Sequence, residues 1–438
     1  MFRYVLAAFT LAALFSCKNE NKDYAQVTND ATVYHGSVKA LTDVIVHDIF
    51  SPPVASRIYS YASIAGYEGA RYGDSTYRSL AGQIPHLAGV PTPEANKEYC
   101  WPMVSSLAFL QTGKTLIFSE DTLQAFITKT LDFYKNSGMP EEVYDRSAAF
   151  AGAISKHIIA WSGKDKYKES RSYPKYSLQK DPATWQPTPP GYMDGIEPSW
   201  NKIRTMVMDS ASQFKPVPPP VFNVKDKNSP FFKEVLETYN TVKNADAEQT
   251  EIANFWDCNP YKLNVTGHVM HATKKISPGG HWINIVGVAG KKSQADYVKA
   301  SASYAMVSIA LFDAFVSCWD EKYRSLLVRP ETVINEQIDP EWLPMLQTPP
   351  FPEYTSGHSA ISASAATILG HLMGNEYSFV DSTQMLFGIA PRKFKNFGEA
   401  AWEVSLSRFY GGIHYMNGIE EGNKQGKMIG NYVFDRLK

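Results

Sequence analysis

Apolar side chains recur at helical spacing along most of the chain, and this periodicity constrains the fold more than any other sequence feature. We find no convincing strand alternation beside it. The segments that predict amphipathic or buried helices are residues 38–50, 54–71, 121–135, 141–162, 231–242 and 295–318. We therefore predict an all-α fold of two packed helical bundles, with the functional site in the C-terminal bundle.

A proline-rich segment at residues 173–224 divides these helices into two groups. Its proline runs at 187–191 and 218–220 exclude regular helix, so we predict an irregular crossover. The aromatic residues in it indicate that it packs against the body of the protein. The predicted division is an N-terminal helical region at 31–224, which includes the crossover, and a C-terminal domain at 225–438.

The N-terminus has the pattern of an export signal. Arg3 precedes an apolar run at residues 4–15 that is too short to span a bilayer stably. The run ends at Cys17 in a sequence that resembles a bacterial lipobox, which predicts a signal peptide at 1–17, lipid attachment at Cys17 and a polar tether at 18–30. An ordinary secretory signal is the alternative. Both interpretations predict that the protein is exported. The lipobox interpretation also predicts that it is anchored to a membrane of the bacterial cell envelope.

Charge and cysteine usage exclude several classes of protein. The net charge of −1 gives no indication of a nucleic-acid surface. The remaining cysteines, Cys100, Cys258 and Cys318, are widely spaced and odd in number, so they predict no disulfide framework. They form no Cys-x-x-Cys pair, which disfavours a thiolate zinc site.

The first segment with chemical potential holds two cations. Lys322 is followed after six residues by Arg329 and Pro330. Pro330 disfavours helix at Arg329, which favours an extended exit from the preceding helix. Either a helical or an extended geometry aims both cations inward, although such a pair alone is more typical of a solvated surface.

The second segment is Ser356, Gly357 and His358, followed by an Ala/Ser-rich helix predicted at residues 360–372. Ser356 and Gly357 would lie at the start of that helix, where free backbone N–H groups and the helix dipole attract an anion. His358 has an ordinary pKa of about 6.5, so it can give or take a proton beside that anion. In isolation a Ser-Gly-His run is a weak signal.

The third segment contains Arg408 and His414. Gly411 and Gly412 between them would end a helix predicted at 397–409 and turn the chain, so that both side chains converge on one point. Alone, the pair is more typical of a surface arginine and a packed histidine. On the helix that follows, small residues such as Gly422 and Gly426 would permit close packing.

Taken in order, the three segments match the signature of the type 2 phosphatidic acid phosphatase and vanadium haloperoxidase superfamily. That signature is Lys, six residues, Arg-Pro; then Pro-Ser-Gly-His; then Ser-Arg, five residues, His, three residues, Asp. The chain is most similar to the bacterial vanadium-dependent haloperoxidase branch, and the resemblance covers most of residues 35–438. Further matching segments lie at 249–256, 280–282 and 313–323.

The resemblance implies roles for each matching residue. Lys322, Arg329, Ser356, Gly357 and Arg408 would bind the oxygens of an oxyanion, and His414 would be its covalent link. In the haloperoxidase version the cofactor is vanadate, His414 ligates vanadium, Lys322 polarises peroxide, His358 handles the proton, and halide is oxidised by hydrogen peroxide.

Two alternatives use the same residues. In an extracytoplasmic phosphatase without cofactor, His414 would attack the phosphorus of a phosphate ester and His358 would protonate the leaving alcohol. A surface lipoprotein that only binds an oxyanion is the second alternative.

The chain departs from the signature at two positions. Thr355 replaces proline, and we predict that it caps the following helix. Gly418 replaces the aspartate expected to orient His414. Its substitute would be Asn417, Glu420, Glu421 or a backbone carbonyl. Losing that carboxylate should harm a phosphohistidine nucleophile more than a static metal ligand, which favours vanadium chemistry.

Three further histidines allow two interpretations each. His268 and His271 would lie one helical turn apart and could bind a metal, although no third ligand is evident. His281, next to Trp282, could line the entrance to the site or pack in the core.

Overall fold

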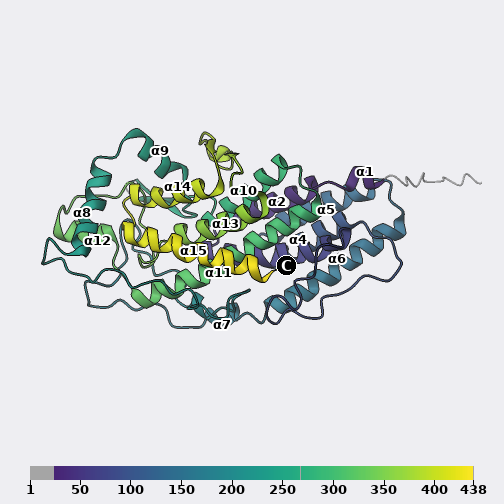
Figure 1. Ribbon diagram of the computed structural model, residues 1–438, viewed down its shortest axis with the longest axis horizontal. Helices are drawn as coiled ribbons and strands as arrows, with labels where there is room; N and C mark the ends of the chain where they lie inside the picture. The colour runs from purple at the N-terminus through teal and green to yellow at the C-terminus, as the bar shows by residue number, and fades with distance from the viewer. Residues whose placement is uncertain (1–23, 267, 438) are drawn as a thin grey trace, which may run out of the picture.

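The computed structural model describes residues 24–266 and 268–437, and the described chain is mostly helical (Figure 1). The predicted signal peptide, Cys17 and residues 18–23 of the predicted tether lie outside it. The helices of five or more residues are α1 (Tyr24–Thr28), α2 (Thr32–His47), α3 (Pro52–Ala70), α4 (Trp101–Lys114), α5 (Glu120–Lys135), α6 (Glu141–Ser162), α8 (Pro230–Lys243), α9 (Ala247–Phe255), α10 (Pro278–Lys292), α11 (Tyr297–Ser325), α12 (Pro330–Gln337), α13 (Gly357–Met373), α14 (Phe397–Tyr410) and α15 (Met416–Arg436).

The predicted all-α class is confirmed, and each predicted helical segment coincides with an observed helix. The first six predicted segments are α2, α3, α5, α6, α8 and α11, and the later ones are α13 and α14. The short helix α7 (Tyr167–Ser170) and the 3-10 turns η1 (Arg71–Gly73), η2 (Trp200–Lys202) and η3 (Met385–Phe387) complete the helical elements. Helices α4, α9, α10 and α12 were not predicted.

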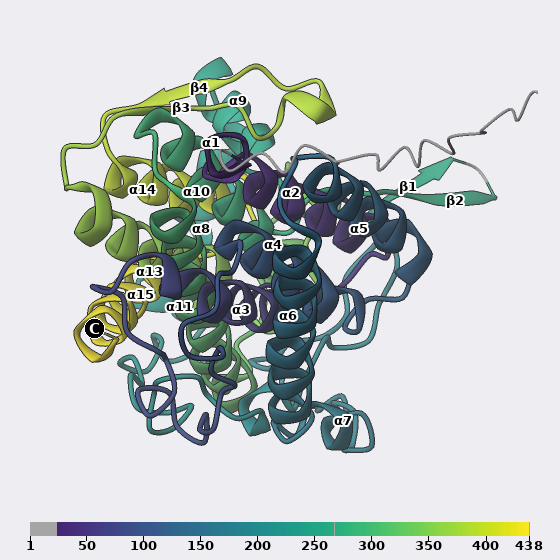
Figure 2. The ribbon, with the colours of Figure 1, turned by 90° about the vertical axis from the view of Figure 1, so that its right-hand side faces the viewer.

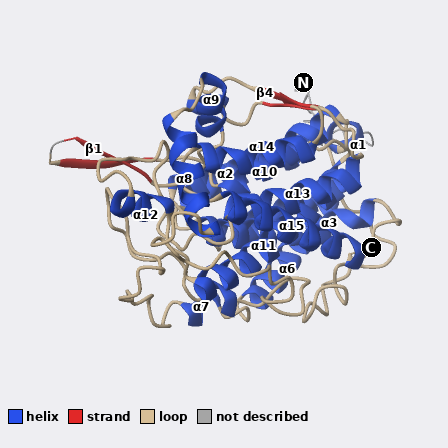
Figure 3. Cartoon of the chain, turned by 60° about the vertical axis from the view of Figure 1, so that its left-hand side comes forward, coloured by secondary structure: helices blue, strands red, loops and turns tan. Residues whose placement is uncertain are grey.

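Two small antiparallel hairpins, which the sequence pattern did not predict, are present at the edge of the molecule (Figure 3). One pairs β1 (Lys262–Thr266) with β2 (Val269–Thr273), and the other pairs β3 (Phe379–Asp381) with β4 (Arg392–Phe394). His268 and His271 therefore lie on a hairpin and not one helical turn apart. Both are exposed, and among the described residues no group of three or more potential ligands could hold a metal ion.

Helix α11 is the central element of the body. It packs against α3 on one side and against α13 and α15 on the other, and Figure 2 shows α3, α13 and α15 nearly end-on around it. Among the described helices it alone is long and apolar enough to cross a membrane, but 94% of its apolar window is buried inside the protein. A single apolar cluster joins residues of both predicted regions. Because α11 is buried along most of its length, Lys322 near its C-terminal end lies in the interior of the protein.

Close packing of α13 on α15 fixes the ends of the two helices that border the site. A Cβ atom at Gly426 would overlap the carbonyl oxygen of Ala360, and one at Gly422 would lie 2.8 Å from the carbonyl oxygen of Ser356. The predicted role of these glycines in close approach is therefore confirmed. Because the backbones of the two helices are in contact, the N-terminus of α13 and the segment that leads into α15 keep fixed positions relative to each other.

The irregular crossover at residues 173–224 is also confirmed, with η2 as the helical turn that the structure places within it. It packs tightly, since Trp185 and Trp200 are fully buried. The backbone N–H groups of Met206, Val207 and Met208 donate to the carboxylate of Asp313 on α11 at 2.6 to 3.0 Å. Desolvation of this carboxylate, opposed by those three donors, raises the pKa of Asp313 to about 6.

The tether prediction is wrong for residues 24–28, which form α1. Tyr24 is buried, and its hydroxyl donates to the Glu98 carboxylate at 2.8 Å. Aromatic burial and this hydrogen bond dock the segment on the body, an interaction between distant parts of the chain that the polar sequence did not reveal.

Candidate active site

Lys322 lies on the last turns of α11 and is completely buried. Its Nζ donates to the carbonyl oxygens of Pro352, Glu353 and Thr355 at 2.9, 2.9 and 2.6 Å. These bonds use all three N–H donors of the ammonium group. Burial, reinforced by the charge of Arg329, lowers the pKa of Lys322 to about 7. Lys322 therefore braces the segment that leads into α13.

Arg329 is the N-cap of α12, with extended backbone (φ −77°, ψ 153°), as the following proline predicted. Its Nε donates to the carbonyl oxygen of Phe351 at 2.9 Å, and its Nη1 donates to that of Ile413 at 2.7 Å. Nη1 also lies 3.1 Å from Nε2 of His414. The buried Nη2 has no hydrogen-bond partner in the protein. A guanidinium clamped by its other nitrogens thus keeps one donor free.

Ser356 and Gly357 begin α13, as predicted. Ser356 is the N-cap, and its Oγ accepts from the Ser359 N–H at 3.3 Å. The prediction that Thr355 caps the helix is wrong, because its hydroxyl donates to Gln425 Oε1 on α15 at 2.8 Å. A Cβ atom at Gly357 would lie 3.4 Å from the Trp319 ring, so the helix start is in close contact with α11.

His358 follows in the first turn of α13, and its Nε2 is buried without a hydrogen-bond partner. Burial, together with the nearby charges of Arg408 and Lys322, lowers the pKa of His358 well below its ordinary value. The imidazole is therefore neutral near pH 7 and can accept a proton.

Arg408 lies in the last turn of α14 and is buried. Its Nη1 donates to the carbonyl oxygen of Trp256 at 3.4 Å, while its Nε has no partner. Burial lowers the pKa of Arg408, and the carboxylate of Asp257 opposes that shift. A second guanidinium nitrogen is thus available to an acceptor.

His414 follows the turn at Gly411 and Gly412, where Gly412 adopts a φ of 76° that favours glycine. Nδ1 of His414 lies 2.6 Å from Glu353 Oε1. Because Nη1 of Arg329 can only donate, Nε2 accepts with its lone pair and the ring proton is on Nδ1, which faces Glu353. This tautomer, assigned from the two partners, is the one that a metal ligand or a nucleophile requires.

Glu353 therefore supplies the carboxylate that the sequence lacks at Gly418. A Cβ atom at Gly418 would lie 2.5 Å from Glu353 Oε1 and 2.9 Å from Oε2, so the Glu353 side chain occupies the space that an aspartate there would need. The predicted substitutes Asn417, Glu420, Glu421 and a backbone carbonyl are therefore all wrong. Glu353 also accepts from the Tyr415 N–H at 3.2 Å, and burial raises its pKa to about 7 against the lowering effect of Arg329 and Lys322.

The structure thus brings the residues predicted to bind an oxyanion to one buried place, and the chemistry of the two arginines fits such a ligand. Lys322 departs from its predicted role, because its three N–H donors are used by backbone carbonyl oxygens and none is left for an oxyanion. Three cations share this place with the Glu353 carboxylate, while Asp257, the carboxylate that acts on Arg408, is paired with Lys275 at 2.8 Å. The excess of positive charge that remains would be costly without an anion. Nη2 of Arg329 and Nε of Arg408 are buried donors without acceptors. Oxyanion oxygens are the acceptors that such guanidinium nitrogens pair with best.

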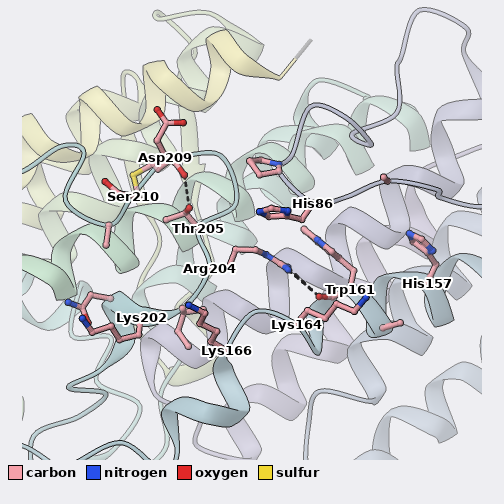
Figure 4. Close-up of a pocket in the computed structure, with 17 residues that line it drawn as sticks. His86, His157, Trp161, Lys164, Lys166, Lys202, Arg204, Thr205, Asp209 and Ser210 are labelled. Carbon is pink, nitrogen blue, oxygen red and sulfur yellow. Dashed lines mark hydrogen bonds between the residues drawn. The ribbon is translucent and has the colours of Figure 1, made fainter.

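A cavity of about 250 Å³ reaches this place, and His358, Arg408 and Phe351 are among its lining residues. The Phe351 ring also faces both cations, with Lys322 Nζ and Arg329 Cζ 5.0 and 5.1 Å from its centroid. A larger surface cavity of about 1110 Å³ lies elsewhere, lined by Lys164, Lys166, Lys202 and Arg204 (Figure 4). It contains none of the predicted site residues.

Comparisons with known proteins agree with this site. A family model described as the VCPO second helical-bundle domain matches residues 302–438, which hold the whole cluster. A crystal structure of a bacterial vanadium-dependent iodoperoxidase is 44% identical, with a TM-score of 0.88 over 93% of this chain and 97% of that chain. No curated protein matches the chain.

A bacterial vanadium-dependent chloroperoxidase is more distant. Its holo form is 15% identical with a TM-score of 0.64, over 89% of this chain and 95% of that chain, which shows a shared fold alone. The fold and the relatives define an all-α enzyme, and its buried cationic cluster is the candidate active site. At 44% identity over nearly the full length of a solved relative, the chain belongs to the vanadium-dependent haloperoxidase family.

Proposed function

We propose that this enzyme oxidises iodide with hydrogen peroxide and uses vanadate held at the buried cationic site. The observation that carries the proposal is the pair of unpartnered guanidinium donors of Arg329 and Arg408 beside a histidine whose Nε2 is unprotonated. The similarity to an iodoperoxidase supports iodide as the halide.

The residues assigned to the oxyanion are the two arginines, the Ser356 hydroxyl and the Gly357 N–H, with His414 Nε2 as the vanadium ligand. When bound, vanadate supplies a Lewis acid that makes peroxide more reactive toward a halide. The arginines would neutralise its charge by charge-assisted hydrogen bonds in a site from which water is largely excluded.

The protein's own groups would prepare this reaction. Glu353 holds His414 in the ligand tautomer, and Lys322 fixes the backbone from Pro352 to Thr355. His358 is neutral, so its free Nε2 can take a proton from peroxide as it enters and return it later.

The lining of the 250 Å³ cavity favours a large halide. Beside His358 and Arg408 it presents apolar side chains, among them Phe50, Met193 and Phe351. A large ion loses less hydration energy than a small one on entering such surroundings, because the cost of desolvation falls with ionic radius. We therefore expect iodide to be oxidised faster than bromide or chloride.

The test uses purified chain incubated with orthovanadate, iodide and peroxide, with triiodide formation followed by absorbance. We expect vanadate-dependent oxidation, fastest with iodide and slower with bromide. The vanadate-free protein is assayed in parallel for p-nitrophenyl phosphate hydrolysis. Hydrolysis without halide oxidation would refute the proposal and leave the phosphatase chemistry in its place.

We also propose that the protein is exported and lipid-anchored, on the strength of the apolar run and Cys17 in its sequence. Fractionation of producing cells tests this. We expect the wild type in the membrane fraction and Cys17→Ser outside it. Recovery of both proteins in the same soluble fraction would contradict lipid anchoring.

A further inference from the structure

A buried triad of Cys258, His281 and Asp381 lies beside the oxyanion site and has no role in the chemistry above. Cys258 follows α9, His281 is in the first turn of α10, and Asp381 ends β3. Cys258 Sγ lies 3.3 Å from His281 Nδ1, and His281 Nε2 lies 2.7 Å from Asp381 Oδ2. Each ring nitrogen of the histidine therefore contacts one member of the triad, and Nε2 also lies 2.6 Å from the Thr383 hydroxyl.

This order of groups is the arrangement that activates a cysteine nucleophile. A carboxylate on one ring nitrogen orients the imidazole and stabilises its charged form, and the other nitrogen can take the thiol proton. Asp381 and His281 are almost wholly buried, and the Trp256 ring stacks on the imidazole at 4.5 Å between centroids. The geometry is thus held by packing as well as by hydrogen bonds.

The electrostatics agree with that arrangement. Burial alone would lower the pKa of His281. The Asp381 carboxylate and the Cys258 sulfur have the larger opposite effect, and the pKa of His281 is raised to about 10. The imidazole is therefore positively charged at neutral pH. Gln384 Nε2 lies 3.5 Å from Cys258 Sγ and 3.2 Å from His281 Nδ1, so this amide packs against the contact between sulfur and imidazole.

Cys258 is only 1% exposed to bulk solvent, yet it lines the same 250 Å³ cavity as His358 and Arg408. A reactant in this cavity therefore has Cys258 as well as residues of the oxyanion site around it. Two of the residues that line this cavity carry a buried polar atom without a hydrogen-bond partner, Nε2 of His358 and Nε of Arg408.

We propose that Cys258, activated by His281 and Asp381, is a second peroxide-reactive centre of this enzyme. The choice of oxidant rests on the proposed function, which brings hydrogen peroxide into the shared cavity. The thiolate sulfur attacks one peroxide oxygen, the S–O bond forms as the O–O bond breaks, and the sulfur loses two electrons. The departing hydroxide takes the His281 proton and leaves as water, so the product is a sulfenic acid.

The experiment exposes vanadate-free, halide-free protein to hydrogen peroxide, so its result does not depend on haloperoxidase activity. At each time point the protein is unfolded, free thiols are alkylated, and Cys100, Cys258 and Cys318 are quantified by peptide mass spectrometry. All three are buried, but Cys100 and Cys318 lack a histidine partner, and burial raises their thiol pKa. We expect Cys258 to be lost about tenfold faster than either.

Two variants separate activation from loss of structure. Asp381→Asn keeps the shape of the side chain but removes its charge, and it should slow oxidation of Cys258 several-fold. The matched control is Asp165→Asn, which breaks a buried ion pair with Arg57 at 2.6 Å and whose side-chain hydrogen-bond partners, Arg57, Tyr61 and Tyr167, do not belong to the triad. It should leave the Cys258 rate unchanged. Equal rates for the three cysteines, or no effect of Asp381→Asn, would overturn the proposal.

Discussion

Replacing His414 with alanine is expected to reduce vanadate-dependent iodide oxidation to the level of free vanadate. The substitution removes the ring nitrogen that would bind vanadium while leaving the arginine donors in place. Oxyanions should therefore still bind, because the cationic charge remains, but without a covalent link and without catalysis. Iodide oxidation and vanadate binding by equilibrium dialysis are measured on the same preparation.

His271→Ala is the matched control, since His271 is exposed on the β2 hairpin. It should retain full activity and full vanadate affinity. If His414→Ala kept a substantial part of the wild-type turnover, another residue would have to bind vanadium and the assignment of His414 would be wrong.

Replacing Glu353 with alanine is expected to weaken vanadate binding about 10- to 100-fold, the usual effect of removing the group that orients a metal-binding histidine. The 2.6 Å contact with Nδ1 fixes the tautomer and the orientation of His414, and without it the ring can turn or place its proton on Nε2, where it cannot bind vanadium. The dissociation constant for vanadate is measured together with iodide turnover.

A second substitution distinguishes positioning of His414 from general stability. A side chain at Gly418 would reach the space that the Glu353 carboxylate occupies, so Gly418→Asp in the Glu353→Ala background should recover part of the lost affinity. Glu68→Ala, which removes a buried carboxylate paired with Arg71, should lower stability without changing vanadate affinity. A double variant no better than Glu353→Ala would contradict the positioning role.

Helix periodicity and the three signature segments were sufficient to predict the class of fold and the membership of the oxyanion cluster. The local rules held at Arg329, where the following proline produced an extended N-cap, and at Gly412, where the chain turns with positive φ. Each of these features depends on neighbours within a few residues, which is the range over which sequence rules apply.

The orienting carboxylate was not predictable in the same way. Glu353 is 61 residues from His414 in sequence, and only the packing of the segment before α13 against the start of α15 brings the two together. His414 therefore does have an orienting carboxylate, so Gly418 does not favour vanadium chemistry over phosphatase chemistry. Membership of the haloperoxidase family is instead established by the 44% identical relative.

The Cys258 triad was missed for a similar reason. Its members come from the end of α9, the start of α10 and the end of β3, over 120 residues of sequence. Strand β3 is three residues long, too short for its alternation to be recognised. From the sequence, His281 was expected either to line the entrance to the site or to pack in the core. Its partner Asp381 could not be anticipated, because Asp381 lies on β3, a strand that was not predicted.

The most direct test of the oxyanion site is a crystal structure of the protein soaked in orthovanadate. We expect vanadium to be bonded to Nε2 of His414. Its oxygens should accept from Nη2 of Arg329 and Nε of Arg408, the two buried guanidinium donors that have no partner in the protein. Vanadate found instead in the lysine-lined surface cavity of Figure 4, with His414 unliganded, would contradict it.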